Sequence, residues 1–260
     1  MKIGFIGSGN MAQAMIKGVL KGKVAEAIFV SDKNEEQLKL LNDVTICKSN
    51  TEVTEKADTV VLAIKPNIYA DVLAEIRDSL KGKTVISIAP GITVGYMKNI
   101  VGEGVGVVRT MPNTPALVGL GMTAMCFDGG VSEEQAACAK QIFESFGRVT
   151  VLDESLFDGV VSVNGSSPAY VYMMIDAIAT GAEKYGISRQ DATILAAQTV
   201  LGSAQMVLET GISPNELKDR VCSPNGTTIE AVHVLEEKGF ASIIMDAMNA
   251  CTKRAIELKK

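Results

Sequence analysis

A glycine-rich turn near the start of the chain constrains the fold most strongly. The apolar run Lys2–Ile6 leads into residues Gly7–Ala12, which read Gly-Ser-Gly-Asn-Met-Ala, and a helix-like stretch follows. In this strand–turn–helix setting, a GxGxxA pattern allows a tight turn at Gly7 and a close backbone approach at Gly9. It predicts a Rossmann-like βα unit with a pyrophosphate on the helix N-terminus. The alternative is a glycine-rich turn that holds no ligand.

The first half of the chain continues this alternation of strand and helix. Its short runs of Val and Ile, without polar alternation, are typical of parallel strands covered on both faces. The predicted strands are Lys2–Ile6, Ala27–Ser31, Thr59–Ile64, Thr84–Ile88, Val105–Arg109 and Met122–Phe127. The helix-like stretches between them include Gln13–Lys21, Glu35–Leu41 and Tyr69–Leu80. Residues 1–152 are therefore predicted to form a doubly wound α/β dinucleotide-binding domain.

From residue 153 onward, helix start and stop signals replace the strand patterns. Ser167-Pro168, Ser213-Pro214 and Ser223-Pro224 each offer a Ser N-cap followed by Pro at the first helical position. Gly186 and Gly211 are typical C-terminal stops. We therefore expect residues 153–260 to form an all-helical domain.

Two stretches in this half are apolar on every side. Residues Ala169–Ala182 carry one charge, at Asp176, and residues Ala192–Leu208 carry none. A membrane span is the alternative, but both stretches fall short of about 18–20 clean apolar residues. A helix that is apolar all round must be buried all round, and a domain of about 110 residues has little interior for two. We therefore expect a homodimer, or a larger ring of dimers, and no membrane segment.

Composition narrows the function classes further. The chain has 260 residues and a net charge of −5, with no basic patch, so nucleic acid is not an expected partner. Its five cysteines show no CxxC spacing, and a strand-like run begins at Lys2, so we expect free thiols, no signal peptide and a cytoplasmic location. With a single histidine, His233, neither a Ser-His-Asp triad nor a histidine-rich metal centre is expected.

The end of the second predicted strand, Ser31-Asp32-Lys33, gives opposing signals about the cofactor. An acidic residue there usually accepts a hydrogen bond from a free ribose 2′-hydroxyl, whereas a basic one accommodates a 2′-phosphate. Ser31 and Lys33 can hold a phosphate while Asp32 turns away, or Asp32 can hold the ribose while Lys33 is solvated. The pattern leaves NADPH and NADH open, with a slight lean toward NADPH.

Turns after the third and fourth strands, Ala63–Pro66 and Ser87–Gly91, belong at the carboxyl edge of the sheet, where ligands bind in such folds. We expect both to contact the cofactor. For Lys65-Pro66, a strand terminator with a solvated lysine is an equal alternative.

Three further segments have compositions that suit a ligand site. Residues Asn164–Tyr170 and Val221–Thr228 place small hydroxyl residues and free backbone N–H groups at helix starts, an arrangement that binds a carboxylate without arginine. The alternative is that they are only well-capped helices. Met111–Pro115 forms a stiff turn that either lines a substrate pocket or rigidifies a loop.

Together these motifs resemble pyrroline-5-carboxylate reductases over essentially the whole chain. The resemblance is carried by Gly7–Ala12, Ala63–Pro66, Arg109–Pro115, Gly165–Tyr170 and Leu217–Glu236, with Ser223–Thr228 as the most specific part. It implies hydride transfer from NADPH or NADH to the C5=N bond of 1-pyrroline-5-carboxylate, which gives L-proline. It also implies a dimer with intertwined C-terminal helices, often assembled into a decamer.

The resemblance also implies site residues. It assigns the substrate carboxylate and ring nitrogen to Ser223, Gly226, Thr227 and Thr228. Because the imine can arrive already protonated, no strong acid is required, and we expect Thr228 to be the catalytic hydrogen-bond partner of the nitrogen. We add Asn113, Ser167 and Asn225 as substrate-binding candidates. It assigns the cofactor to Gly7, Ser8, Gly9, Asn10, Met11, Asn50, Ala63, Ile64, Lys65 and Pro66. We add Ile6, Ser31, Lys33 and Ala89.

Two departures from the family pattern bear on these assignments. Asn225 stands where the family usually has glycine, and Asn tolerates positive φ better than most residues. Ser31-Asp32-Lys33 replaces the common Ser-Asn-Arg.

Two related classes of enzyme and one non-catalytic protein are the alternative functions. A β-hydroxyacid dehydrogenase is disfavoured because its lysine acid/base is missing between Gly165 and Glu183, whereas other imine reductases share the architecture and stay open. A non-catalytic dinucleotide sensor would not need the second anion site.

Overall fold

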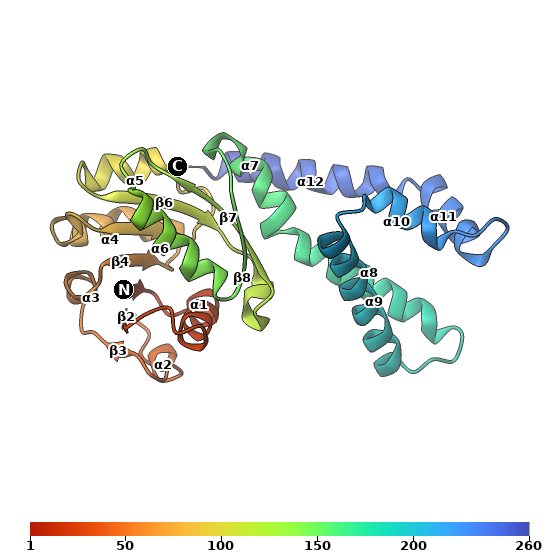
Figure 1. Ribbon diagram of the computed structural model, residues 1–260, viewed down its shortest axis with the longest axis horizontal. Helices are drawn as coiled ribbons and strands as arrows, with labels where there is room; N and C mark the ends of the chain where they lie inside the picture. Colours follow the sequence, from red (N-terminus) through yellow and green to blue (C-terminus); the bar gives the residue numbers. More distant parts are fainter. Residues whose placement is uncertain (260) are drawn as a thin grey trace. The chain divides into compact units, whose positions relative to one another are not determined.

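Residues 1–259 are described by a computed structural model (Figure 1). Contacts within the chain divide it into two units. The sheet unit is Met1–Ser166 together with the segment from Cys251 onward, and the helical unit is Ser167–Ala250. Residues 153–166, which the sequence groups with the helices, lie with the sheet unit because Phe157 and Val160 are buried against Ala124 and Cys126.

One eight-stranded sheet forms the centre of the sheet unit. Its strands lie in the order β3-β2-β1-β4-β5-β6-β7-β8. They are β1 (Lys2–Ile6), β2 (Ala27–Ser31), β3 (Thr45–Ile46), β4 (Thr59–Leu62), β5 (Thr84–Ser87), β6 (Gly106–Met111), β7 (Gly121–Phe127) and β8 (Gly147–Val151). The first six are mutually parallel, which confirms the predicted Rossmann-like fold.

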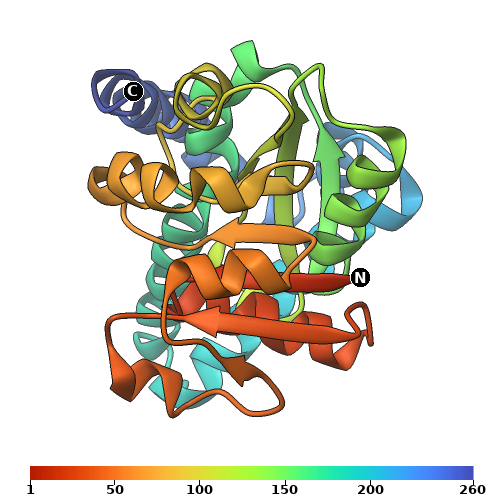
Figure 2. The ribbon, with the colours of Figure 1, turned by 90° about the vertical axis from the view of Figure 1, so that its left-hand side faces the viewer.

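Helices cover both faces of this sheet, and Figure 2 shows the strands between them. The α-helices are α1 (Asn10–Lys21), α2 (Glu35–Leu38), α3 (Asn50–Lys56), α4 (Tyr69–Ile76), α5 (Val94–Val101), α6 (Glu133–Glu144) and α7 (Phe157–Val160). Short 3-10 turns span Pro66–Ile68, Arg77–Leu80, Thr114–Val118 and Glu154–Leu156, and a π-helical turn spans Val161–Gly165.

Alternate residues of each strand enter two separate cores, as expected for strands buried on both faces. Phe5 and Val61 pack with α1 and α6, whereas Ile6, Val60 and Leu62 pack with α3, α4 and α5. The continuous apolar runs in the sequence follow from this double burial.

The far edge of the sheet differs from the all-parallel expectation. β7 runs antiparallel to β6, and β8 then pairs parallel to β7. The connection from β6 to β7 holds only the 3-10 turn Thr114–Val118, which is too short for the crossover that a parallel pair requires. The strands β3 and β8 were not predicted.

The helical unit contains α8 (Ser167–Glu183), α9 (Arg189–Thr210), α10 (Pro214–Val221), α11 (Thr227–Glu237) and most of α12 (Phe240–Glu257). Gly211 ends α9 in the left-handed conformation, with φ of 67°, as predicted. The Ser213 hydroxyl accepts a hydrogen bond from the Glu216 amide (3.3 Å) and caps α10. The start predicted at Ser223-Pro224 is wrong, because those residues form a turn and α11 begins at Thr227.

Packing between α8 and α9 buries small residues and leaves large ones uncovered. Ala179, Ala192 and Ala196 are buried where the two helices meet. Large side chains on the other faces are exposed, among them Tyr172, Met173, Ile178, Ile194, Leu195, Leu201 and Leu208. Among residues 1–259, no helix is long and apolar enough to cross a membrane.

Candidate functional site

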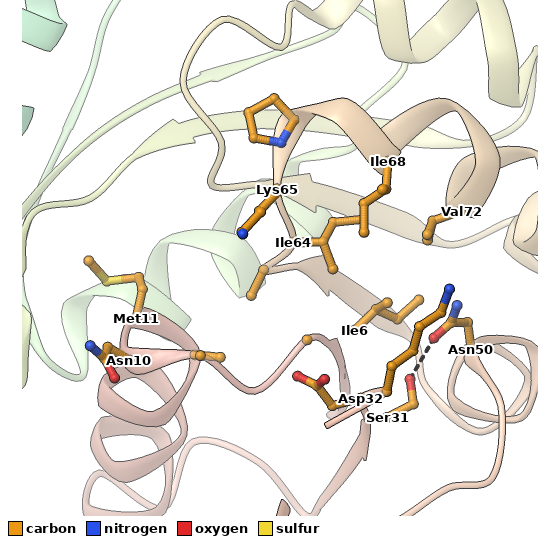
Figure 3. A pocket seen from close by; sticks show the side chains of 16 residues that line it. Ile6, Asn10, Met11, Ser31, Asp32, Asn50, Ile64, Lys65, Ile68 and Val72 are labelled. Atoms are coloured by element: carbon orange, nitrogen blue, oxygen red, sulfur yellow. Dashed lines mark hydrogen bonds between the residues drawn. The ribbon is translucent and has the colours of Figure 1, made fainter. Parts of the chain in front are cut away.

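A pocket of about 580 Å³ opens at the carboxyl ends of β1, β2 and β4 (Figure 3). Its volume falls within the roughly 300–1,000 Å³ of small-molecule sites, and its place matches the ligand crevice of open α/β sheets. The lining residues are Ile6, Gly7, Gly9, Asn10, Met11, Ala12, Ser31, Asp32, Lys33, Asn50, Ala63, Ile64, Lys65, Pro66, Ile68 and Val72.

Two glycines shape the loop between β1 and α1 in different ways. Gly7 has a φ of +97°, and a Cβ added there would lie 2.4 Å from the Ala63 carbonyl oxygen. Gly9 has an ordinary φ of −64°, and an added Cβ would meet no atom within 4 Å. Gly7 is therefore needed for the turn itself, whereas Gly9 keeps a space open at the pocket wall.

The N-terminus of α1 is arranged to receive an anion. Gly9 is its N-cap and no side chain caps it, in contrast to α3, where the Ser49 hydroxyl accepts from the Glu52 amide (3.1 Å). The first-turn N–H groups and the helix dipole therefore favour a negative group here. A dinucleotide pyrophosphate fits this open, uncapped start beside Gly9.

A chain of buried hydroxyl groups joins β4, which leads into the pocket, to its neighbour β5. Tyr69 donates to the Leu62 carbonyl (2.9 Å), and Ser87 donates to the Tyr69 hydroxyl (2.9 Å). Burial raises the pKa of Tyr69 far above its usual value, so the phenol stays protonated. These bonds fix the ends of both strands just before the turns Ala63–Pro66 and Ile88–Gly91.

Hydrogen bonds hold both polar side chains at the end of β2. The Asp32 carboxylate accepts from the Ser8 amide (2.6 Å) and the Ser8 hydroxyl (2.8 Å). The Ser31 hydroxyl donates to Asn50 Oδ1 (2.8 Å), as the dashed line in Figure 3 marks. Asn50 in turn donates to Glu75 on α4 (2.9 Å).

Most residues predicted for the cofactor lie in this pocket. Ser8 and Ala89 do not line it, being buried at 0% and 4% exposure. Ile68 and Val72 line it although they were not predicted. Ile68 and Val72 are four residues apart at the start of α4, a spacing visible in the sequence that places them on one side of the helix.

The most specific family motif, Ser223–Thr228, forms the turn between α10 and α11 and the start of α11. The Gly226 amide donates to the Ser223 carbonyl (3.0 Å), and Asn225 adopts a φ of 57°. Asn adopts positive φ more readily than most residues, so it can replace the usual glycine at this position. A Cβ on Gly226 would lie 2.3 Å from Ser223 Oγ and 3.0 Å from the Ser223 carbonyl oxygen, so a side chain here would displace the serine hydroxyl.

Like α1, α11 begins at a glycine without a side-chain cap. Gly226 is its N-cap, Thr227 is exposed, and Thr228 is half-buried in the first turn. The start of α11 therefore combines free backbone N–H groups with two hydroxyl side chains. His233 is exposed farther along the same helix.

Two other substrate candidates lie elsewhere. Asn113 belongs to the sheet unit, where its amide donates to Asn164 Oδ1 (3.0 Å) and its oxygen accepts from the Met122 amide (2.9 Å). Ser167 is half-buried at the first residue of α8. In the described chain, no group of three or more His, Cys, Asp and Glu side chains is arranged to hold a metal ion.

Comparison with known proteins decides the family. Over 265 aligned residues the chain is 45% identical to the pyrroline-5-carboxylate reductase of Escherichia coli, covering 100% of this chain and 98% of the relative. The chain belongs to the pyrroline-5-carboxylate reductase family. Residues 154–258 match the model described as pyrroline-5-carboxylate reductase dimerisation. Residues 2–91 match that described as NADP oxidoreductase, coenzyme F420-dependent.

Solved structures of pyrroline-5-carboxylate reductases share the whole fold. The Coxiella burnetii enzyme superposes with a TM-score of 0.93 at 34% identity, covering 99% of this chain and 98% of its own. The Plasmodium falciparum enzyme, determined with NADP bound, has a TM-score of 0.91 at 30% identity and covers 100% and 98%. This chain is thus an NAD(P)H-dependent oxidoreductase whose helical half is the dimerisation domain of its family.

Proposed function

We propose that this chain reduces 1-pyrroline-5-carboxylate to L-proline with NADPH or NADH, the last step of proline biosynthesis. The observation that carries the proposal is the pair of helix starts, at α1 and α11, that begin at uncapped glycines within the two family motifs. One suits a pyrophosphate and the other a carboxylate.

The sheet unit would hold the cofactor. The N–H groups of Asn10 and Met11 at the start of α1 would face the pyrophosphate across Gly9, and the turn Ala63–Pro66 would line the opposite wall. When bound, the reduced nicotinamide supplies a hydride. The Tyr69–Ser87 hydrogen bond would keep the ends of β4 and β5 rigid, and this rigidity would help to hold the cofactor in a fixed orientation.

The start of α11 would hold the substrate. The carboxylate of 1-pyrroline-5-carboxylate would accept hydrogen bonds from the N–H groups in the first turn of α11 and from the hydroxyl groups of Ser223 and Thr227. The Thr228 hydroxyl would contact the ring nitrogen of the substrate. An imine nitrogen that arrives protonated makes C5 electrophilic, so addition of hydride at C5 gives the secondary amine directly. No acidic side chain is needed, and the segment 223–228 contains none.

Exposed apolar surface supports a homodimer. The uncovered large side chains of α8 and α9 lie within residues 154–258, which match the dimerisation family. Assembly of dimers into a decamer and a cytoplasmic location are further parts of the proposal. The decamer rests on the family resemblance, and the location rests on the free cysteines. Analytical ultracentrifugation would distinguish a dimer from a decamer.

The deciding experiment mixes the purified protein with 1-pyrroline-5-carboxylate and either NADPH or NADH. We expect loss of the reduced cofactor's near-ultraviolet absorbance and formation of L-proline, identified by chiral chromatography. Protein that binds cofactor and yet forms no proline with either one would overturn the proposal.

Thr228→Val tests the substrate site because it removes the hydroxyl at nearly constant volume. We expect kcat/KM for the imine to fall by about 10- to 100-fold, the equivalent of one hydrogen bond to a charged group, with cofactor affinity unchanged. Thr45→Val, at an exposed position of β3, is the matched control and should leave kcat/KM unaltered.

A further inference from the structure

The end of the chain returns to the sheet unit. Residues Cys251–Lys259, which we call the C-terminal strap, belong to that unit, whereas the first part of α12 belongs to the helical unit. In both Figure 1 and Figure 2 the end of the chain lies next to α5. Polar contacts attach the strap near its start and at its end. The Thr252 hydroxyl donates to the Ser162 hydroxyl (3.0 Å), and the Lys259 ammonium forms an ion pair with the Asp158 carboxylate (2.9 Å).

The segment that receives the strap is itself fixed to the sheet. Ser162 is buried, and its hydroxyl donates to the Gly159 carbonyl (2.8 Å). Asp158 follows Phe157, whose ring is buried and has its centre 4.7 Å from the Arg109 guanidinium. Buried contacts of this kind limit local opening of a segment. The ion pair therefore connects the end of the chain to a part of the sheet unit that has little freedom to move.

Near its end, the strap lies against Gly91 through backbone atoms. A Cβ added to Gly91 would lie 2.9 Å from the Leu258 carbonyl oxygen and 3.5 Å from the Lys259 Cα. Leu258 is 57% exposed, so this contact depends on the path of the backbone and not on the leucine side chain. Gly91 is buried and has a φ of +76°, a conformation that favours glycine. A shift of the strap would therefore change the surroundings of Gly91 directly.

Gly91 belongs to the turn that follows β5 at the carboxyl edge of the sheet. In a doubly wound sheet, the strands on either side of the switch point bind the two halves of a dinucleotide. The pocket beside β1 and β2 suits the adenosine half, so the nicotinamide half would extend past β4 toward β5. The turn is fixed at its two ends, since Ser87 donates to Tyr69 (2.9 Å) and the Val94 amide donates to Glu154 (2.8 Å). The strap covers the middle of the turn.

We propose that the C-terminal strap positions the turn Ile88–Gly91 for the nicotinamide half of the cofactor, and that Asp158 and Lys259 are positioning residues because their ion pair holds the strap in place. This inference rests on the proposed function and deepens it. Neither residue lines the pocket in Figure 3, so both act through the backbone of the strap. Displacements on the order of 1 Å are enough to slow a reaction between positioned groups, so a small shift of the turn has a measurable effect.

Removal of the end of the strap tests the proposal by binding alone. A chain that ends at Glu257 lacks Leu258 and Lys259. NADPH binding is measured by fluorescence titration, and binding of its adenosine half, adenosine 2′,5′-bisphosphate, by isothermal titration calorimetry. We expect the Kd for NADPH to rise by about 10-fold and the Kd for the bisphosphate to stay within about twofold, because only the site for the nicotinamide half loses its preorganisation. A shortened chain that weakened both ligands equally, or neither, would overturn the inference.

The ion pair provides a second test that keeps the chain at full length and decides the question if the shortened chain does not fold. Lys259→Glu should weaken NADPH binding by about threefold, a modest effect because the pair is partly exposed. Asp158→Lys should have the same effect, and the double variant should restore the wild-type Kd because it re-forms the pair with opposite polarity. Lys81→Glu, at an exposed lysine before β5, is the matched control. Single variants that bind NADPH as the wild type does, or a double variant without restoration, would overturn the inference.

The outcome is separable from that of the proposed function, because neither binding assay uses the imine. A protein that shows the expected losses of NADPH binding and forms no proline would contradict only the proposed reaction. A protein that forms proline and binds NADPH equally well with and without the end of the strap would contradict only the role of the strap. In the reaction itself, the shortened chain should show a raised KM for NADPH and a lower kcat, with the KM for the imine unchanged. A merely destabilised protein would lower kcat and leave both KM values unaltered.

Discussion

Single residues in the phosphate loop carry separate structural and functional demands. Gly7 is fixed by sterics: its φ of +97° and its contact with the Ala63 carbonyl leave no room for a side chain. Gly9 satisfies neither condition, since its φ is ordinary and its Cβ direction is open. The fold itself does not require glycine at position 9, whereas the close approach of a cofactor pyrophosphate does. The two positions therefore respond differently to the same substitution.

Gly7→Ala should lower the free energy of unfolding by about 2 kcal/mol or more, because it adds a backbone clash to a strained φ. Gly9→Ala should change it by less than about 0.5 kcal/mol. The Gly9 variant should instead weaken NADPH binding by at least about 10-fold, because the methyl group occupies the space of the pyrophosphate. Urea unfolding and fluorescence titration measure the two effects. Equal stability loss in both variants would contradict this division.

At the scale of elements, the π-helical turn Val161–Gly165 is bound to the sheet by one side-chain amide, that of Asn164. Asn164, 8% exposed, donates to the carbonyls of Met111 (2.6 Å) at the end of β6 and Met122 (3.0 Å) at the start of β7. Its oxygen also accepts from Asn113. Because β6 and β7 are antiparallel neighbours, this clamp closes their junction.

Asn164→Ala would leave two part-buried carbonyl groups, those of Met111 and Met122, without their donor. We expect the free energy of unfolding to fall by about 1–3 kcal/mol, with a smaller loss for Asn164→Gln, which retains the amide. Asn99→Ala, at an exposed position of α5, is the control and should stay within about 0.5 kcal/mol of the wild type. Denaturant unfolding at a fixed protein concentration measures all three. A loss at Asn99 equal to that at Asn164 would contradict a specific clamp.

Elements buried on both faces were predictable from sequence, and those at the sheet edges were not. β4 and β5 are buried at every position, so their runs of Val and Ile leave one interpretation. β8 is only half-covered and β3 has two exposed residues, so neither produces a strong apolar run. The direction of β7 depends on the length of the connection from β6 and not on the amino-acid composition of the strand. Ser223-Pro224 failed as a helix start because Asn225 and Gly226 extend the turn by further residues.

The candidate site divides in the same way. The glycine-rich loop and the turn Ala63–Pro66 are local motifs, and the sequence placed them in the pocket. The bonds from Ser8 to Asp32 span 24 residues, and those from Asn113 to Asn164 span 51. Such pairings arise from strand order and not from local pattern.

At the scale of the whole molecule, the apolar helices of the helical unit leave surface for a second copy to cover. Ile194, Leu201 and Leu208 are spaced by seven residues on α9, so they form one stripe, and they are exposed by 60%, 47% and 55%. The helix carries no charged residue between Ala192 and Leu208. Exposed apolar stripes of this length are characteristic of protein interfaces.

Leu201→Glu should therefore disrupt the dimer, because it places an unpaired charge in the middle of this stripe. We expect the wild type to sediment as a dimer or larger assembly, with a Tm that rises with protein concentration, and the variant to sediment as a monomer with a lower Tm. Leu40→Glu makes the same exchange at an exposed leucine of the sheet unit and should preserve the assembly. If both variants kept the wild-type sedimentation coefficient, α9 would lie outside the interface. The exposed faces of α8 would then be the surface that the second copy covers.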